Sequence, residues 1–365
     1  MKSPKIRFKG FDGDWEQRKV REVTDRYDNL RIPVAASLRV AGTTPYYGAN
    51  GIQDYVEGYT HDGEFILVAE DGANDLKNYP VKCVKGRIWV NNHAHVLQGK
   101  YACADNQFLA YAISQADIES LLVGGGRAKL NAETLMDIEL LLPSKDEQIQ
   151  IGHYIARLDN LITLHQKKFE QLTILKKYML QKMFPQNGSD KPEIRFDGFT
   201  DDWEQRKLSD VVDVRSGRDY KHLEEGDIPV YGTGGYMLSV SEALSDDEDA
   251  IGIGRKGTID NPYILRAPFW TVDTLFYAVP REKHDLNFVY GIFQNINWKA
   301  KDESTGVPSL SKATINAVST MTPDYEEQRL IGEYFSNLDH LITLHQQKCD
   351  ELRNAKKFML QNMFI

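Results

Sequence analysis

Two short motifs in this sequence carry residue types that could take part in catalysis. Asp260-Asn261-Pro262-Tyr263 matches the Asn-Pro-Pro-Tyr motif of amino-methyltransferases only in part, because the second proline is missing and no glycine-rich strand turn precedes it. We therefore favour an ordinary Asn-Pro turn over a methyltransferase site. Glu282 and Lys283 are adjacent and not spaced as a nuclease Glu-x-Lys pair. The sequence also lacks the G-x-x-x-x-G-K-S/T loop of ATP-hydrolysing proteins. We therefore expect a chain that is not itself an enzyme.

Histidine and cysteine are the residue types that could bind a metal. His93 and His95 alternate on an expected strand, but no carboxylate or third ligand stands at a recognisable spacing. A structural pair, or a pair that contacts nucleic acid, is the favoured alternative to a metal site. The cysteines, Cys83, Cys103 and Cys349, form no C-x-x-C pair. We expect reduced thiols, no structural zinc and no cofactor in this chain.

Two copies of a long helix dominate the chain, one over residues 144–184 and the other over 324–365. In each copy apolar or near-apolar residues repeat in alternating steps of four and three, which is the heptad pattern of a helix–helix seam. Lysine replaces an apolar residue at the same seam position in both copies. About 40 residues at 1.5 Å each give a rod of roughly 60 Å, far longer than an ordinary globular helix. The seam residues are Ile151, Ile155, Leu158, Ile162, His165, Phe169, Leu172, Met179 and Met183 in the first copy, and Ile331, Phe335, Leu338, Ile342, His345, Cys349, Leu352, Met359 and Met363 in the second, with Lys176 and Lys356 at the skipped position.

The starts of both helices are marked by the same signals. Pro143 precedes Ser144, and Glu147 follows three residues later, which is the pattern of a capping box. Asp324 and Glu327 repeat this arrangement after a second proline.

A shorter repeat precedes each of two longer, diverged segments. Residues 6–19, the first strip, return as residues 194–207, the second strip, with 11 of 14 positions identical. Between strip and helix lie region 1, residues 20–142, and region 2, residues 208–322. Both regions contain short β-branched or aromatic runs bounded by glycine, such as 64–69 and 250–253, and one helical candidate each, at 105–120 and 284–297. We predict one mixed, strand-rich fold carrying two different surfaces.

The charge of the chain is unevenly distributed. The net charge is −9, which by itself argues against a nucleic-acid partner. Residues 145–184 carry seven Lys/Arg against four Asp/Glu, whereas residues 208–322 carry eleven against seventeen. Any DNA contact therefore requires local basic loops and a basic partner. Because the N-terminus shows no signal-peptide run and no segment is apolar enough for a membrane span, we expect a cytoplasmic protein without membrane contact.

The strips, the size of the two regions and the helix motif together resemble the specificity (S) subunit of type I restriction-modification enzymes. The residues that carry this resemblance are W-E-Q-R-K in each strip, P-x-x-x-E-Q at each helix start and L-D-x-L-I-T-L-H-Q inside each helix. The resemblance covers essentially the whole chain. Within the regions it extends to the Tyr-Gly-x-x-Gly turn of region 2 and to a Gly-x-x-x-Leu element before each helix.

The resemblance implies an α+β chain: two tandem α/β target recognition domains separated by two long antiparallel coiled-coil helices, with a pseudo-two-fold internal repeat. Short connections between one helix and the next region also favour the antiparallel arrangement. The expected segments are 1–143 for the first strip and recognition domain, 144–184 for the first spacer helix, 185–323 for the second strip and recognition domain, and 324–365 for the second spacer helix.

The resemblance also implies the partners. A specificity subunit binds double-stranded DNA at a bipartite site and positions two adenine methyltransferase (M) subunits, and usually restriction (R) subunits. S-adenosylmethionine, ATP and Mg belong to those partners. The alternative from another class is a protein–protein scaffold, in which the two domains bind polypeptides and the helices dimerise.

Polar residues in glycine-containing loops are the candidates for DNA contacts. Arg and Lys can pair with guanine, and Asn and Gln with adenine, in the major groove. Each residue alone fits an ordinary polar turn equally well, and the prediction concerns the set. The candidates are Gly48, Asn50, Gln53, Asn91, Asn92, His93, Arg127 and Lys129 in region 1, and Gly232, Thr233, Gly234, Arg255, Lys256, Thr258, Asp273 and Thr274 in region 2.

Apolar residues beside the seam make the helix stripe wider than a two-helix contact requires. We predict that this surplus binds the methyltransferase subunits; the alternative is that it packs on the helix's own globular domain. The predicted partner contacts are Tyr154, Leu161, Leu164, Leu175, Leu341 and Leu344.

Overall fold

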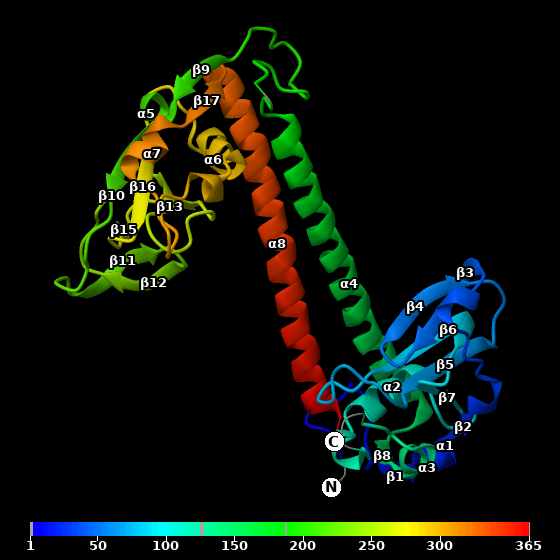
Figure 1. Cartoon of the computed structure of the whole chain (residues 1–365). Coiled ribbons are helices and arrows are strands. Elements are labelled where there is room, and N and C mark those ends of the chain that lie inside the picture. The colour runs from blue at the N-terminus through cyan, green and yellow to red at the C-terminus, as the bar shows by residue number, and fades with distance from the viewer. Residues whose placement is uncertain (1–2, 125–127, 187, 365) are drawn as a thin grey trace. The chain divides into compact units, whose positions relative to one another are not determined.

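The computed structural model describes residues 3–124, 128–186 and 188–364. The chain divides into two compact units: unit 1 comprises Met1–His165 and Gln347–Ile365, and unit 2 comprises Gln166–Gln346. Each unit holds one strip, one region, the beginning of one long helix and the end of the other (Figure 1). The internal repeat therefore gives two equivalent units, although unit 1 is built from two separate stretches of the chain.

Region 1 folds around a six-stranded sheet with one helix packed on it. The strand order is β2-β7-β5-β6-β3-β4, and all neighbours are antiparallel except β3 and β6. Helix α2 (Asn106–Ser114) packs on β5, β6 and β7 and buries Phe108, Leu109 and Ile113. The strands are β2 (Thr24–Arg26), β3 (Ala41–Gly48), β4 (Gly51–Val56), β5 (His61–Ala69), β6 (Val81–Val90) and β7 (Ala94–Gly99).

Region 2 repeats this plan with its strands divided between two sheets. One sheet has the order β10-β16-β13-β14, the other β12-β11-β15 with β11 and β15 parallel. Helix α6 (Leu286–Asn295) packs on β13 and β16, and in Figure 1 it lies between that sheet and α8. The strands are β10 (Val212–Ser216), β11 (Glu225–Gly232), β12 (Gly235–Val240), β13 (Ala250–Gly254), β14 (Tyr263–Leu265), β15 (Trp270–Thr271) and β16 (Leu275–Pro280).

The predicted strand runs are confirmed in β5 and β13, and the helical candidates in α2 and α6. Both helices are shorter than predicted. After α2 the chain leaves the helix, and Ile118 is buried in the core. Asp105 and Asp285 cap α2 and α6 by accepting hydrogen bonds from Phe108 N and Phe288 N.

A two-stranded sheet closes each region at its base. In unit 1 the strip strand β1 (Glu16–Lys19) pairs with β8 (Glu139–Leu142); in unit 2 β9 (Glu204–Lys207) pairs with β17 (Ser319–Thr322). Both pairs are antiparallel and share the same register, so the first and last residues of each region are held together. Short helices flank these strands: α1 (Val20–Val23), α3 (Ala132–Asp137), α5 (Leu208–Val211) and α7 (Lys312–Ala317).

The two long helices are α4 (Lys145–Lys182) and α8 (Tyr325–Met363), and within each unit they pack antiparallel. In unit 1 Asp159 contacts Lys356 while Ile162, further along α4, contacts Cys349, earlier in α8. Most seam residues near the ends are buried, including Ile151, Ile155, Phe335 and Met363. Cys349, which the heptad pattern places in the seam, is fully buried.

The lysines that interrupt the seam form ion pairs across it. Lys176 Nζ lies 2.6 Å from Asp339 Oδ1 in unit 2, and Lys356 Nζ lies 2.6 Å from Asp159 Oδ1 in unit 1. In unit 1 Tyr111 also donates a hydrogen bond of 2.7 Å to Asp159. Each lysine lies close to its aspartate in only one register of the two helices. These ion pairs therefore specify that register.

The Glu-Gln pair at each helix start anchors the helix to its unit. Glu147 accepts a bidentate ion pair from Arg7 of the first strip, with both distances 2.7 Å, and Gln148 Oε1 accepts from Asp105 N at 3.0 Å. In unit 2 the same two contacts recur as Arg195–Glu327 and Asp285–Gln328.

The capping prediction is therefore corrected in part. Asp324 does cap α8, since its carboxylate accepts from Glu327 N at 2.8 Å. The carboxylates of Glu147 and Glu327, however, are fully buried and bind the arginines of the two strips. In a capping box they would instead accept a hydrogen bond from the backbone N–H at the start of the helix. A charged arginine binds a buried carboxylate more strongly than a neutral backbone N–H does.

Candidate nucleic-acid interface

The β11–β12 hairpin presents the first predicted segment of region 2. Gly232 ends β11 and Gly235 begins β12, with Thr233 and Gly234 forming the turn between them. The Tyr263 hydroxyl donates a 2.6 Å hydrogen bond to the Gly232 carbonyl, which holds the turn from below. A Cβ at position 232 would lie 2.7 Å from the Met237 sulfur, so any larger residue there would have to displace that side chain.

The Arg255–Thr258 loop follows β13 and lies beside this hairpin. Arg255 N donates to the Thr274 carbonyl at 2.8 Å, and Arg255 Nη1 to the Asp273 carbonyl at 3.3 Å. A Cβ added to Gly257 would lie 3.9 Å from Thr233 Oγ1, so the loop and the hairpin turn are neighbours. The structure thus brings all the predicted residues of region 2 together, with the backbone carbonyls of Asp273 and Thr274 supporting Arg255.

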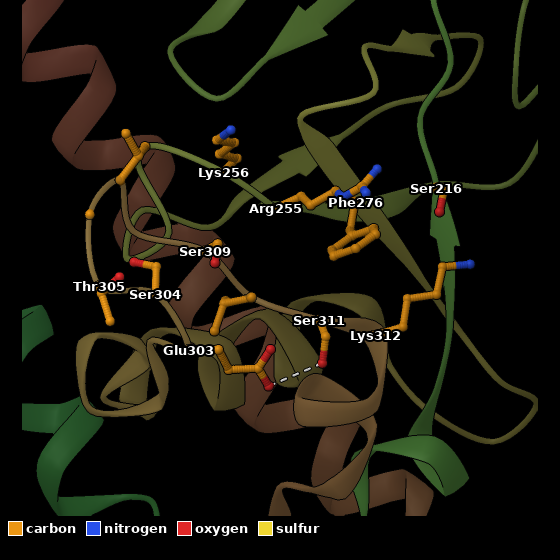
Figure 2. Close-up of a pocket in the computed structure, with 13 residues that line it drawn as sticks. Ser216, Arg255, Lys256, Phe276, Glu303, Ser304, Thr305, Ser309, Ser311 and Lys312 are labelled. Carbon is orange, nitrogen blue, oxygen red and sulfur yellow. Dashed lines mark hydrogen bonds between the residues drawn. The ribbon is translucent and has the colours of Figure 1, made fainter.

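A cavity of about 860 Å³ opens next to these loops. Figure 2 shows Arg255 and Lys256 along one side of it, with Phe276 beneath Arg255, whose guanidinium lies 5.8 Å from the ring centroid. The other side is formed by residues 303–312, which carry Lys312 and several hydroxyl groups. Sequence reasoning missed this segment as part of a site, although its Gly306 and Leu310 form the Gly-x-x-x-Leu element noted above.

The charges around this cavity favour an anionic ligand. Within the described part of the chain, neither Lys256 nor Lys312 forms an ion pair. The single carboxylate in the lining, Glu303, accepts a hydrogen bond from the Ser311 hydroxyl at 3.1 Å. These cations stand out because region 2 as a whole has more acidic than basic residues.

The β3–β4 hairpin of region 1 is equivalent to β11–β12, down to the positions of its two register shifts. Gly48 again faces the second strand, where a Cβ would lie 2.2 Å from Gln53 Nε2. Asn91 is buried beneath the turn: its N donates to Tyr47 O at 3.1 Å, and its Nδ2 to Gln53 Oε1 at 3.4 Å. The structure therefore brings Gly48, Gln53 and Asn91 together.

The remaining candidates of region 1 gather around the turn at residues 70–74. Asn50 donates from Nδ2 to the Gly72 carbonyl at 2.9 Å, and the ring of His93 contacts Asp71. Lys129 Nζ lies 2.8 Å from Glu70, and this hydrogen bond raises the pKa of Lys129. Asn92 is exposed beside them, and Arg127 lies outside the described residues.

His93 and His95 have different surroundings. His95 is buried, with Nδ1 2.7 Å from Asp28 and Nε2 2.9 Å from the Leu130 carbonyl, so its role is structural. Burial would raise the pKa of Asp28, but hydrogen bonds from His95 and Val96 N lower it overall. Among the described residues no group of three His, Cys, Asp or Glu is placed to hold a metal ion.

The predicted partner contacts lie on the outer faces of α4 and α8. Leu161, Leu175, Leu341 and Leu344 are exposed, and Leu164 is the most open at 62%. Tyr154 differs, because its ring packs against Phe8 of the first strip with 5.7 Å between centroids. None of the helices that the structure describes is both long and apolar enough to span a membrane.

Comparison with known proteins agrees with this architecture. The family model described as type I restriction modification DNA specificity domain matches residues 12–173 and 200–354. The chain therefore belongs to the family of type I restriction-modification DNA specificity subunits, and the resemblance proposed from its motifs is confirmed.

Two relatives differ in how much of their length this chain covers. A putative type I restriction enzyme specificity subunit of Haemophilus influenzae is 43% identical over 157 residues, which is 43% of this chain but only 39% of that protein. A type I restriction enzyme specificity subunit of Methanocaldococcus jannaschii is 23% identical over 396 residues, covering 94% of this chain and 90% of the relative.

Among solved structures, the type I restriction-modification S subunit from M. genitalium superimposes with a TM-score of 0.80 over 100% of this chain and 99% of that one. At 18% identity this likeness establishes the fold alone. The predicted fold class, with two α/β domains and two packed long helices, is confirmed.

Proposed function

We propose that this specificity subunit recognises a bipartite site on double-stranded DNA, with region 1 contacting one half-site and region 2 the other. The observation that carries the proposal is the equivalent placement of the β3–β4 and β11–β12 hairpins. Each hairpin turn meets a second polar segment far away in sequence, Asn91 in region 1 and Arg255–Thr258 in region 2. The two surfaces share a backbone and differ in side chains, as two different half-sites require.

The side chains at these surfaces suit contacts in the major groove. Arg255 can pair with guanine O6 and N7, and the amide of Gln53 with adenine N6 and N7. Lys256 and Lys312 carry the charge that phosphate contacts need, and such contacts set the position of a protein on DNA. The domain segments 1–143 and 185–323 are the parts to which we assign this recognition.

The chain leaves the reaction to its partners. Two methyltransferase subunits would bind the exposed leucines of α4 and α8, use S-adenosylmethionine and modify an adenine flipped out of the duplex. Restriction subunits would add ATP- and Mg-dependent cleavage, and the assembled complex would act on DNA in the cytoplasm. Family membership favours this function over a protein–protein scaffold.

Methylation mapping of the chain co-expressed with its methyltransferase partner tests the proposal. Arg255→Ala should change the half-site recognised by region 2 and leave the other unaltered, whereas Gln53→Ala should do the reverse, so each variant is the control for the other. Arg266→Ala, an exposed arginine paired with Asp249 and absent from the cavity lining, should change neither. A complex that methylates the same sites with Arg255→Ala and Gln53→Ala as without them would contradict the assignment.

A further inference from the structure

The segment that closes the cavity of region 2 is the loop 304–309, and hydrogen bonds fix the base of this loop. Asp302 Oδ1 accepts hydrogen bonds of 2.9 Å from both Ser304 N and Ser309 N, and Glu303 N donates to the Ser309 carbonyl at 3.1 Å. The bonds from Ser309 N and Ser304 N lower the pKa of Asp302. One carboxylate therefore ties together the two ends of residues 304–309.

The base of the 304–309 loop is also hydrogen-bonded to the Arg255–Thr258 loop. Gly257 N donates to the Pro308 carbonyl at 2.8 Å, and Leu310 N to the Arg255 carbonyl at 2.9 Å. Gly257 has φ = +98°, a conformation in which a side chain is strained. Glycine at this position thus allows the Arg255 loop and the 304–309 loop to form one continuous wall.

The tip of the loop, Thr305-Gly306-Val307, is exposed although its base is fixed. Val307 is 56% exposed on this tip. A β-branched side chain has few rotamers, so the hydrogen-bonded base of the loop limits the directions that the Val307 side chain can take. Pre-organised loops of this kind lose little conformational entropy when they bind.

We propose that the tip Thr305–Val307 is a further base-contacting element of region 2, with the Val307 methyl groups packing on the 5-methyl group of a thymine in the major groove. Asp302 acts as its positioning residue through the two backbone N–H groups that it holds. This inference rests on the proposed function and extends it to a loop tip to which neither the motifs nor the comparisons give a role.

Three observations favour DNA as the ligand of this tip. Arg255 and Lys256 face the loop across the cavity, and Lys312 stands three residues after the end of the loop (Figure 2). These cations can bind the phosphates on either side of a base that the tip contacts. An apolar side chain beside them also suits the thymine methyl, which is the apolar feature of the major groove.

Methylation mapping with the methyltransferase partner again provides the test. Val307→Ser should keep both half-sites except at one A·T position of the half-site recognised by region 2, where preference should fall by about tenfold. Asp302→Ala should reduce the base preference at the same position, because the base of the loop loses both hydrogen bonds. Asp302→Asn should restore the preference, since its amide oxygen still accepts from both N–H groups.

Leu38→Ser is the matched control, because Leu38 is also an exposed apolar residue but lies in region 1. It should leave the half-site of region 2 unchanged. If Arg255→Ala alters that half-site while Val307→Ser does not, this inference is wrong and the proposed function stands. If neither variant alters it, both are wrong. Should Val307→Ser abolish methylation altogether, Val307→Ala decides between the same outcomes.

Discussion

Lys312 is the clearest candidate for a phosphate contact, since it lines the cavity of region 2 and forms no ion pair among the residues described. Each phosphate contact contributes about 0.9 to the slope of log affinity against log salt on duplex DNA. We predict that Lys312→Gln lowers that slope by about one and weakens binding equally for all DNA sequences. Titrations of the methyltransferase complex at several salt concentrations measure this.

Lys299→Gln is the matched control for that titration, because Lys299 is exposed in the same region but paired with Asp260 at 2.6 Å. Its removal should leave the salt slope unaltered. An unchanged slope in Lys312→Gln, or a loss confined to one DNA sequence, would contradict a phosphate contact.

The Arg7–Glu147 pair makes a separate prediction about stability. Glu147 is fully buried, so removing its partner leaves an uncompensated charge in the core. We predict that Arg7→Ala lowers the free energy of unfolding by about 3–5 kcal/mol. Arg18→Ala, which breaks the exposed pair with Glu16 in the same strip, should cost less than about 1 kcal/mol. Urea unfolding followed by tryptophan fluorescence compares the two; equal losses would show that the buried pair has no special role.

At this scale the sequence predicted residue types better than residue partners. The glycines and polar residues of the hairpin turns are visible as turn signals, and the structure brings those of region 2 together. The partners of Glu147 and Lys176 depend on contacts more than a hundred residues apart, which local patterns do not encode. The capping box was a reasonable local interpretation that a distant arginine overrides.

At the scale of elements, the outer faces of α4 and α8 carry leucines that the seam does not use. Exposed apolar stripes on a helix mark a binding surface or a tendency to aggregate. We predict that the isolated chain is poorly soluble and that the methyltransferase subunits cover these residues. Replacing Leu164 and Leu344 together by serine should increase the soluble fraction of the isolated chain and weaken its co-purification with the methyltransferase.

Serine at Thr163 and Thr173, two polar positions on α4, is the control and should change neither property. An isolated wild-type chain that stays monomeric, soluble and tightly bound to its DNA site would count against the surface. So would undiminished co-purification of the double leucine variant.

The long helices were predictable because heptad periodicity and start signals are local properties of a sequence. Lys176 and Lys356 appeared only as interruptions of the seam. The structure explains them, since each forms an ion pair with an aspartate of the other helix. The loop at 303–312 was missed for a different reason: its position depends on Gly257 and Arg255, which precede it by about fifty residues.

At the scale of the whole molecule, we predict that the length of the two long helices determines the gap between the two half-sites. Inserting one heptad after Leu172 and another after Leu352 keeps the seam in register and adds about 10 Å of rise. At about 3.4 Å per base pair, we predict roughly three additional base pairs in the spacer and unchanged half-sites. Methylation mapping of the double insertion measures both.

A single insertion serves as the control, because it shifts one half of the seam against the other and should reduce stability without giving a defined new spacer. If the double insertion altered the half-sites and kept the spacer, the helices would not determine the spacing.

If each of the two equivalent regions recognises its own half-site, exchanging one region should change that half-site alone. The strips at 6–19 and 194–207 are nearly identical and close each region through β1–β8 and β9–β17, so residues 20–142 can be replaced by the corresponding region of a relative. We predict that methylation mapping of this hybrid with its methyltransferase partner shows one new half-site and one unchanged half-site. A hybrid that methylates with both half-sites changed, or with neither changed, would contradict the account.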